Sequence, residues 1–162
     1  MALDMFIDMG AIKGESRDKE MKEKIDILAW SWGMSQSGTT HTGGGGGAGK
    51  ASFQDISFTK YLDSSSNAIM NALAKGSHLP TVTLTVRKAG EGQKKYISIV
   101  LNEVLVTSVS TGGSGGEDRL TENVTLNFAK FTFAYTPQDS KGTVAGDKTF
   151  SWDIAENHGE VK

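Results

Sequence analysis

The segment from Gly44 to Lys50 has the residue types and spacing that could bind a nucleotide phosphate. Gly44, Gly49 and Lys50 stand where the glycines and the lysine of a phosphate-binding loop would be. Such a loop needs a hydroxyl directly after the lysine to hold Mg²⁺, and this chain has Ala51 there. It also needs a helix next, whose first amides bind the phosphates, whereas residues 53–61 have the composition of a strand. The spacing is therefore a chance match within a run of glycines, and we expect no nucleotide site.

Other residue types that catalyse reactions or bind metals are scattered along the chain. The histidines have no partners at metal-ligand spacing; they are His41, His78 and His158. Asp26, Asp55 and Glu103 are isolated carboxylates on expected strands. Ser114 lies beside glycines but lacks the strand–turn–helix setting of a hydrolase nucleophile. The chain has no cysteine, which excludes disulfides and thiol nucleophiles. The sequence thus predicts no enzyme, no metal and no cofactor.

Length and charge limit the class of protein and its partners. The 162 residues fit one domain that buries roughly two-thirds of its unfolded surface. A net charge of -2 argues against general binding of nucleic acids or anionic membranes. The first residues carry no basic segment and no long apolar run follows, so neither a signal peptide nor membrane insertion is expected.

Two strand-like runs, Ile25–Trp32 and Phe53–Tyr61, are joined by a long glycine-rich connection. Its length of about twenty residues far exceeds the roughly two to five residues of an ordinary hairpin loop. Each glycine adds freedom to the unfolded chain that folding must remove, so the run Gly43–Gly47 does not stabilise a compact domain. Two alternatives remain open: the loop is disordered, or something outside this domain holds it.

Alternation in the first of these strands directs its tryptophans toward a core. Leu28, Trp30 and Trp32 share one face of the strand, and Ile27 and Ser31 lie on the other. Two tryptophans on one face usually indicate burial. Ser31 then faces water or another surface.

The remaining chain predicts further strands and one helix. The polar cluster at residues 63–66 can cap a helix and Gly76 can end it, which predicts a helix over Ser66–Lys75. The run Tyr96–Thr107 is apolar on both faces. This predicts a central strand that is covered on two sides, or one strand shared between two surfaces.

The strand expected from Thr121 to Tyr135 changes phase along its length. Its apolar side chains are even-numbered up to Phe128 and odd-numbered from Phe131 onward. This predicts a β-bulge at residues 129–130, with both phenylalanines in the core. Strands that bend in this way commonly turn a corner between two sheets or around a barrel. The alternative is that one aromatic set is exposed and binds a partner.

Six segments of the chain form a recognisable series in sequence order. They are Leu28–Ser37, Ala48–Lys50 at the end of the glycine run, Phe58–Tyr61, Val104–Val106, Ser110–Asp118 and Leu120–Phe128. In this combination the chain resembles the haemolysin-coregulated protein (Hcp) family. The resemblance covers most of the chain, while residues 63–80, 138–149 and the tail carry little of it.

The resemblance implies a mainly β fold, an antiparallel β-barrel-like domain of two sheets with one short flanking helix. Residues 1–162 would form a single domain, with an extended loop at 42–50 and a frayed tail at 155–162. It further implies a structural protein of the bacterial type VI secretion system, whose hexameric rings stack into a tube that a contractile sheath expels behind a spike. Implied partners are further copies of the chain, sheath and spike proteins, and effectors carried in the lumen. The protein would be cytoplasmic before firing and extracellular afterwards, without a cleaved signal peptide.

Several residues are assigned roles on this basis. We expect the glycine-rich loop to join stacked rings; its residues are Thr42, Gly43, Gly44, Gly45, Gly46, Gly47, Ala48, Gly49 and Lys50. Ser31 is the candidate for contact with cargo in the lumen, and the core is expected to hold Trp30, Trp32, Phe128 and Phe131. Two other classes of protein stay open: a secreted β-sandwich binding module, for example one that binds carbohydrate, and an enzyme whose site escapes notice.

Overall fold

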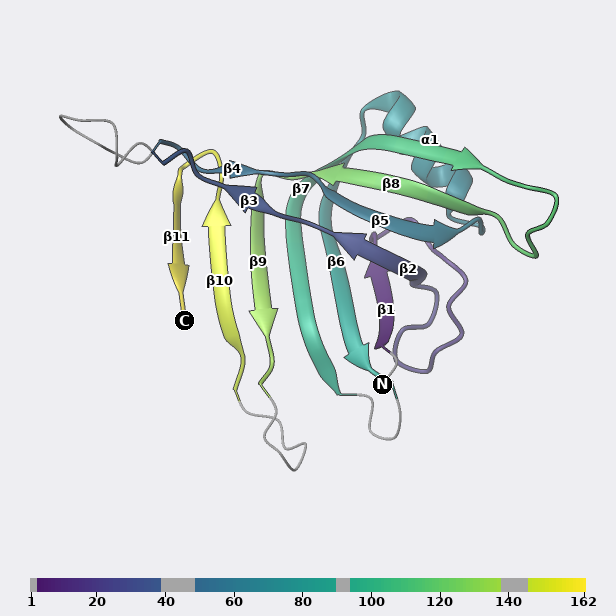
Figure 1. The fold of residues 1–162 in the computed structure, drawn as a ribbon, viewed down its shortest axis with the longest axis horizontal. Coiled ribbons are helices and arrows are strands. Elements are labelled where there is room, and N and C mark those ends of the chain that lie inside the picture. The colour runs from purple at the N-terminus through teal and green to yellow at the C-terminus, as the bar shows by residue number, and fades with distance from the viewer. Residues whose placement is uncertain (1–2, 39–48, 90–93, 138–145) are drawn as a thin grey trace.

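The computed structural model describes residues 3–38, 49–89, 94–137 and 146–162, and these residues are mainly β. Its elements, in chain order, are β1 (Leu3–Asp8), β2 (Ile25–Ser31), β3 (Met34–Ser35), β4 (Ser52–Phe53), β5 (Ile56–Tyr61), α1 (Ser66–Lys75), β6 (His78–Lys88), β7 (Lys95–Gly112), β8 (Thr121–Asn127), β9 (Lys130–Tyr135), β10 (Lys148–Asp153) and β11 (His158–Val161). The expected mainly β, barrel-like fold with a short flanking helix is confirmed (Figure 1).

The barrel closes through β8. Antiparallel pairing runs from β7 through β6, β1, β2 and β5 to β8, and β8 pairs with β7 again. Strands β9, β10 and β11 extend the sheet away from the barrel, and together with the first part of β7 we call them the outer sheet. Strands β3 and β4 form a separate two-stranded sheet. Closure removes two sheet edges that would otherwise present unpaired backbone groups.

Strand β7 belongs both to the barrel and to the outer sheet. For the run Tyr96–Thr107, this confirms the prediction of one strand shared between two surfaces. Residues 97–102 of β7 pair with β9 and its residues 105–112 pair with β8. Between them Glu103 takes a φ of 54°, a left-handed conformation that is uncommon outside glycine. The buried side chains change phase there, from Leu101 to Val104. Strand β7 therefore turns at Glu103 as it passes from the outer sheet into the barrel.

In β2 the predicted faces are wrong for Ile27 and Leu28. Ile25 and Ile27 are buried, whereas the side chain of Leu28 is 41% exposed. The register with β5 shifts between Ile27 and Ala29, so Leu28 is an extra residue that reverses the alternation. Trp30 follows on the core side as a partly buried side chain. The bulge thus directs both the isoleucines and the tryptophan toward the core.

The strand predicted from 121 to 135 is two strands that separate at Phe128 and Ala129. Strand β8 stays in the barrel and β9 joins the outer sheet. At the turn between them, the amide of Ala129 donates to the carbonyl of Asn102. Phe128 and Phe131 are 5% and 0% exposed, and their rings meet edge to face with centroids 5.9 Å apart. The predicted phase change is therefore a corner between two sheets rather than a bulge within one strand.

The helix α1 has the predicted bounds. Gly76 ends it with a φ of 64°, and its amide donates to the carbonyl of Leu73. The Ser65 side chain makes no cap hydrogen bond. Ile69 and Ala72 are the apolar side chains that the helix buries.

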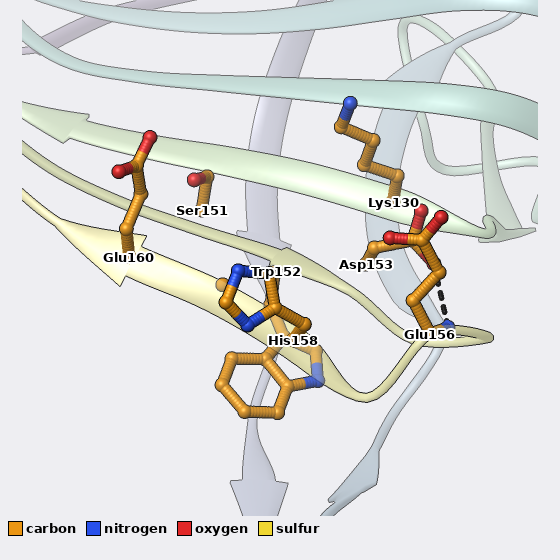
Figure 2. Close-up of a pocket in the computed structure, with 8 residues that line it drawn as sticks. Lys130, Ser151, Trp152, Asp153, Glu156, His158 and Glu160 are labelled. Carbon is orange, nitrogen blue, oxygen red and sulfur yellow. Dashed lines mark hydrogen bonds between the residues drawn. The ribbon is translucent and has the colours of Figure 1, made fainter.

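The C-terminal residues include strand β11, in the segment where the sequence predicted a frayed tail. Strand β11 pairs with β10, and Lys162 exchanges two backbone hydrogen bonds with Thr149, of 3.0 and 2.9 Å. Gly159 lies opposite Trp152, and a Cβ at Gly159 would stand only 1.9 Å from the carbonyl oxygen of Ser151. Figure 2 shows the side chains of these two strands around a shallow hollow. Backbone pairing and the close approach at this glycine hold the tail.

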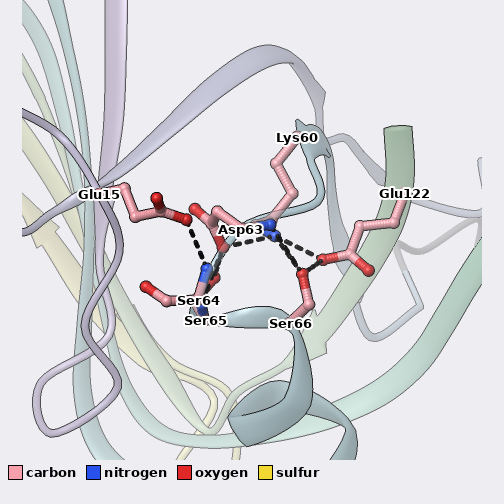
Figure 3. A network of polar contacts seen from close by, with 7 residues as sticks. All are labelled: Glu15, Lys60, Asp63, Ser64, Ser65, Ser66 and Glu122. Carbon is pink, nitrogen blue, oxygen red and sulfur yellow. Dashed lines mark hydrogen bonds and ion pairs between the residues drawn. The ribbon is translucent and has the colours of Figure 1, made fainter. Parts of the chain in front are cut away.

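A buried polar network closes the end of the barrel beneath the start of α1 (Figure 3). Lys60 on β5 and Glu122 on β8 are direct cross-strand partners, form an ion pair and have fully buried side chains. The Lys60 Nζ also lies 3.1 Å from both the Asp63 carboxylate and the Ser66 hydroxyl. The Ser66 hydroxyl donates to Glu122 over 2.7 Å. The network ties two barrel strands to the first residue of the helix.

The polar connection between β1 and β2 is held to the sheet by Arg87 on β6. The Arg87 guanidinium is 2% exposed, donates to Asp18 over 2.7 Å and lies 4.8 Å from the centroid of the Phe6 ring. Glu20 lies 3.4 Å from the same guanidinium. This hydrogen bond from Arg87 holds the pKa of Asp18 below its ordinary value and raises the pKa of Arg87.

We predict that Lys60→Met destabilises the protein by about 3–5 kcal/mol, because it leaves the Glu122 carboxylate buried without its cation. The double variant Lys60→Met/Glu122→Leu should recover most of this loss, since both charges are then absent. Chemical denaturation followed by tryptophan fluorescence measures both. Lys75→Met, at an exposed helix position, is the matched control. A double variant no more stable than the single one would contradict the prediction.

We predict that the stability difference between the wild type and Asp18→Asn depends on pH. The folded-state pKa of Asp18 is lowered, so its contribution is complete above the unfolded value near 3.8 and is lost as the pH falls through the folded value. Wild type should therefore exceed the variant at pH 7, and the difference should shrink below about pH 3.8. Melting temperatures across this range test it, with the exposed Glu117→Gln as control. A constant difference would refute the role of Arg87.

Candidate assembly surface

The buried network contains residue types that catalyse reactions elsewhere, but it is closed to substrate. A serine hydroxyl within 3.1 Å of a lysine amine is the arrangement of a Ser–Lys nucleophile pair. Here the side chains of Lys60 and Glu122 are 0% exposed, and Ser66 is 5% exposed. The Ser66 hydroxyl already donates to Glu122. This constellation stabilises the fold rather than forming an accessible active site.

Within the described ranges, no three His, Asp or Glu side chains gather closely enough to hold a metal ion. The hollow of about 160 Å³ in Figure 2 is lined by side chains of both charges, among them Lys130, Glu156 and Glu160. No helix among the described residues is long and apolar enough to cross a membrane.

Ser31 lies at the end of β2 on the outer face of the barrel, opposite Trp30. It pairs with Ser57 of β5 and lines a shallow hollow of about 200 Å³ together with Thr59 and Asn123. The Thr59 hydroxyl donates to the Asn123 amide oxygen over 2.6 Å, so adjacent strands are linked on this face. Trp30 and Phe58 also line this hollow, so the candidate cargo residue stands where hydroxyl and amide groups border two aromatic side chains.

This outer face continues across β8 to β7 without ionic side chains pointing out from β5 or β8. Asn127 and Thr107 donate to Asp55 at its margin, over 2.9 and 2.8 Å. The ionic residues of these two strands, Lys60 and Glu122, point into the barrel instead. The charges of β5 and β8 thus lie inside the barrel, whereas β2 exposes the carboxylate of Asp26, and the Arg119 guanidinium lies 3.9 Å from the centroid of the Tyr61 ring on β5. The uncharged part of this surface we name the neutral face; its residues are Ser31, Ser57, Thr59, Asn123, Thr125 and Asn127.

The arm formed by β3 and β4 carries the predicted stacking loop. Met34 pairs with Phe53 and Ser35 with Ser52, and the two strands lie across the ends of β9 and β10 (Figure 1). Of the nine predicted loop residues, those from 42 to 48 lie outside the described part of the chain. Gly49 and Lys50, which are described, are exposed where the chain returns toward β4.

The four residues predicted for the core lie in one region but differ in burial. Phe128 and Phe131 are buried, while Trp30 and Trp32 are partly buried and pack against the core. Trp32 meets Phe131 edge to face with centroids 4.7 Å apart. Sequence reasoning missed Lys60 and Glu122, although both share the parity of buried neighbours such as Phe58 and could have been found from it.

Known proteins resemble this chain over nearly its whole length. The model of the family described as "Type VI secretion system effector, Hcp" matches residues 6–135. Protein hcp1 of Pseudomonas aeruginosa is 60% identical over 159 residues, which cover 97% of this chain and 98% of that protein.

Two solved structures share the fold. One, described as a type six secretion system protein, has a TM-score of 0.92 at 28% identity, covering 98% of this chain and 100% of that one. Hcp1 from Salmonella typhimurium has a TM-score of 0.82 at 32% identity, covering 99% of this chain and 100% of that one. Family, sequence and fold agree across the barrel, the helix and the outer sheet, so this chain belongs to the Hcp family of secreted type VI secretion system proteins.

Proposed function

We propose that this protein is the ring-forming subunit of a type VI secretion tube, with six copies to a ring and rings stacked through the glycine-rich loop. The observation that carries the proposal is a closed barrel from which a two-stranded arm leads out to a run of glycines. Closure leaves the barrel complete within one chain. The strands of the barrel do not include these glycines, so the loop is proposed to contact another copy.

The neutral face supports a role as the wall of the lumen. Hydroxyl and amide groups such as those of Thr59 and Asn123 can hydrogen-bond to many partners without the strong pairing of ionic groups. A wall of this kind suits cargo that must be held and then released. Ser31, one of the residues that line this hollow, is the proposed contact for an effector.

The remaining partners follow from the same role. Sheath proteins would surround the tube, a spike would stand at its end, and the protein would pass from the cytoplasm to the exterior when the sheath contracts. The subunit would act without catalysis, in keeping with the sealed Lys60–Ser66 pair. A carbohydrate-binding module gains no support, because the family and the relative that match this chain are described as type VI secretion and Hcp proteins.

We predict that deletion of Gly43–Gly47 spares the ring and abolishes tube assembly and secretion. The barrel and its core do not involve these residues, so light scattering should report an unchanged ring. Fixing a flexible residue costs about 1–2 kcal/mol, so ring stacking through this loop should be weak in solution and depend on its full reach. Secretion from cells measures the tube. Normal secretion by the deletion variant would exclude a stacking role for the loop.

We predict that Ser31→Gln leaves the ring intact and reduces recovery of co-purified effector. The longer side chain fills the shallow hollow of the neutral face without reaching the core, because Ser31 is exposed. The same substitution at Ser114, exposed on the loop before β8, is the matched control and should leave recovery unchanged. Equal effector recovery by both variants would remove Ser31 from the cargo-binding wall.

A further inference from the structure

The sheet formed by β3 and β4 is too short to hold its own position. Each strand has two residues, joined in the register Met34–Phe53 and Ser35–Ser52. A two-stranded sheet is at best marginally stable in water even when longer than this. The direction in which the arm leaves the barrel must therefore be set by contacts at its base. We call Trp32, Gly33, Phe53 and Gln54 the arm root.

Aromatic packing joins the arm root to the outer sheet. The Phe53 ring on β4 has its centroid 5.4 Å from that of Phe131 and 6.2 Å from that of Trp152. Trp32 packs on the opposite leg against Phe131, at 4.7 Å. Phe131 is 0% exposed, so it gives both legs of the arm one fixed point of contact. Pairs at these distances attract beyond the burial of their surface.

Hydrogen bonds lock the two legs of the arm root to each other. The Trp32 indole donates to the carbonyl of Gln54 over 2.9 Å. The Gln54 amide donates to the carbonyl of Gly33 over 3.0 Å. A Cβ at Gly33 would lie 3.2 Å from the Gln54 side-chain oxygen, so the glycine permits this close approach. The outgoing and returning chains are thus bonded at the base, before β3 and β4 begin to pair.

We infer that Phe53, Trp32 and Trp152 are positioning residues that aim the arm, and with it the stacking loop, at the neighbouring ring. The inference rests on the proposed stacking function of that loop. None of the three side chains is part of the closed barrel strands, and Phe53 belongs to the arm itself. Removing the Phe53 phenyl ring should therefore let the arm leave the barrel in several directions. The fold of the subunit and its assembly into hexameric rings should be unchanged.

The test is Phe53→Ala, with three readouts on the full-length protein. Light scattering should show an unchanged ring. Hydrogen exchange of the amides at 33–35 and 52–54 should accelerate by about tenfold or more, because the base of the arm opens locally. Tube assembly and secretion should fall to the level of the Gly43–Gly47 deletion. Phe53→Leu, which keeps an apolar side chain against Phe131, should retain most of both exchange protection and secretion.

Phe133→Ala is the matched control, since it removes a partly buried phenylalanine from β9 in the same outer sheet, outside the arm root. It should lower the melting temperature while leaving secretion and exchange at the arm root unchanged. Wild-type secretion by Phe53→Ala, while the loop deletion abolishes secretion, would overturn the positioning role alone. Normal secretion by the deletion variant as well would overturn the stacking function and this inference together. Equal loss of secretion in Phe53→Ala and Phe133→Ala would mean that general destabilisation causes both losses, which would overturn the positioning role.

Discussion

The rest of the structure depends on the sharing of β7 between two sheets. One strand of 18 residues pairs with β9 along its first part and with β8 along its second. Because β8 and β9 are consecutive in the chain, the chain must turn sharply where they part, and Phe128 fills the barrel side of that turn. The turn of β7 at Glu103 lies beside the point where β8 and β9 part. The carbonyl of Asn102, the preceding residue, accepts a hydrogen bond from the amide of Ala129. The barrel therefore closes and the sheet extends from the same place on β7. The rings of Phe128 and Phe131 pack against each other there.

Strands β5 and β8 direct their charged side chains into the barrel and uncharged polar side chains outward. Lys60 and Glu122 are buried as a cross-strand pair, at a cost in desolvation that an apolar pair would avoid. One oxygen of Glu122 has no hydrogen-bond partner among the described residues, so stability alone does not account for the pair. A charged pair can meet in only one register, whereas apolar side chains tolerate a slip between β5 and β8. Since a slip of one residue would turn these charges outward, the same pair keeps the neutral face neutral.

Local signals in the sequence predicted the parts of the fold that local chemistry determines. The helix bounds were correct because Gly76 adopts a left-handed conformation that favours glycine. The faces of Ile27 and Leu28 were wrong because the extra residue at Leu28 is set by pairing with β5, and no residue type marks it. The strand in the tail was not predicted because β11 depends on Gly159 meeting Trp152, a contact that appears only in the folded sheet. The ring and tube came from family resemblance, since nothing in hydrophobic periodicity counts subunits.

If rings stack through the glycine-rich loop as proposed, the loop and the arm root meet complementary requirements for contact between rings. Glycines offer backbone groups and almost no side-chain surface, so the loop itself has little with which to select a docking position. Specificity must then come from where the loop is held, and the arm root fixes that position through Phe131, which is buried. Fixing the base would also lower the entropy that docking of the loop must remove, because the arm root is already held by hydrogen bonds and ring contacts. Under this proposal the geometry of the arm root, and not the glycine run, selects the docking position.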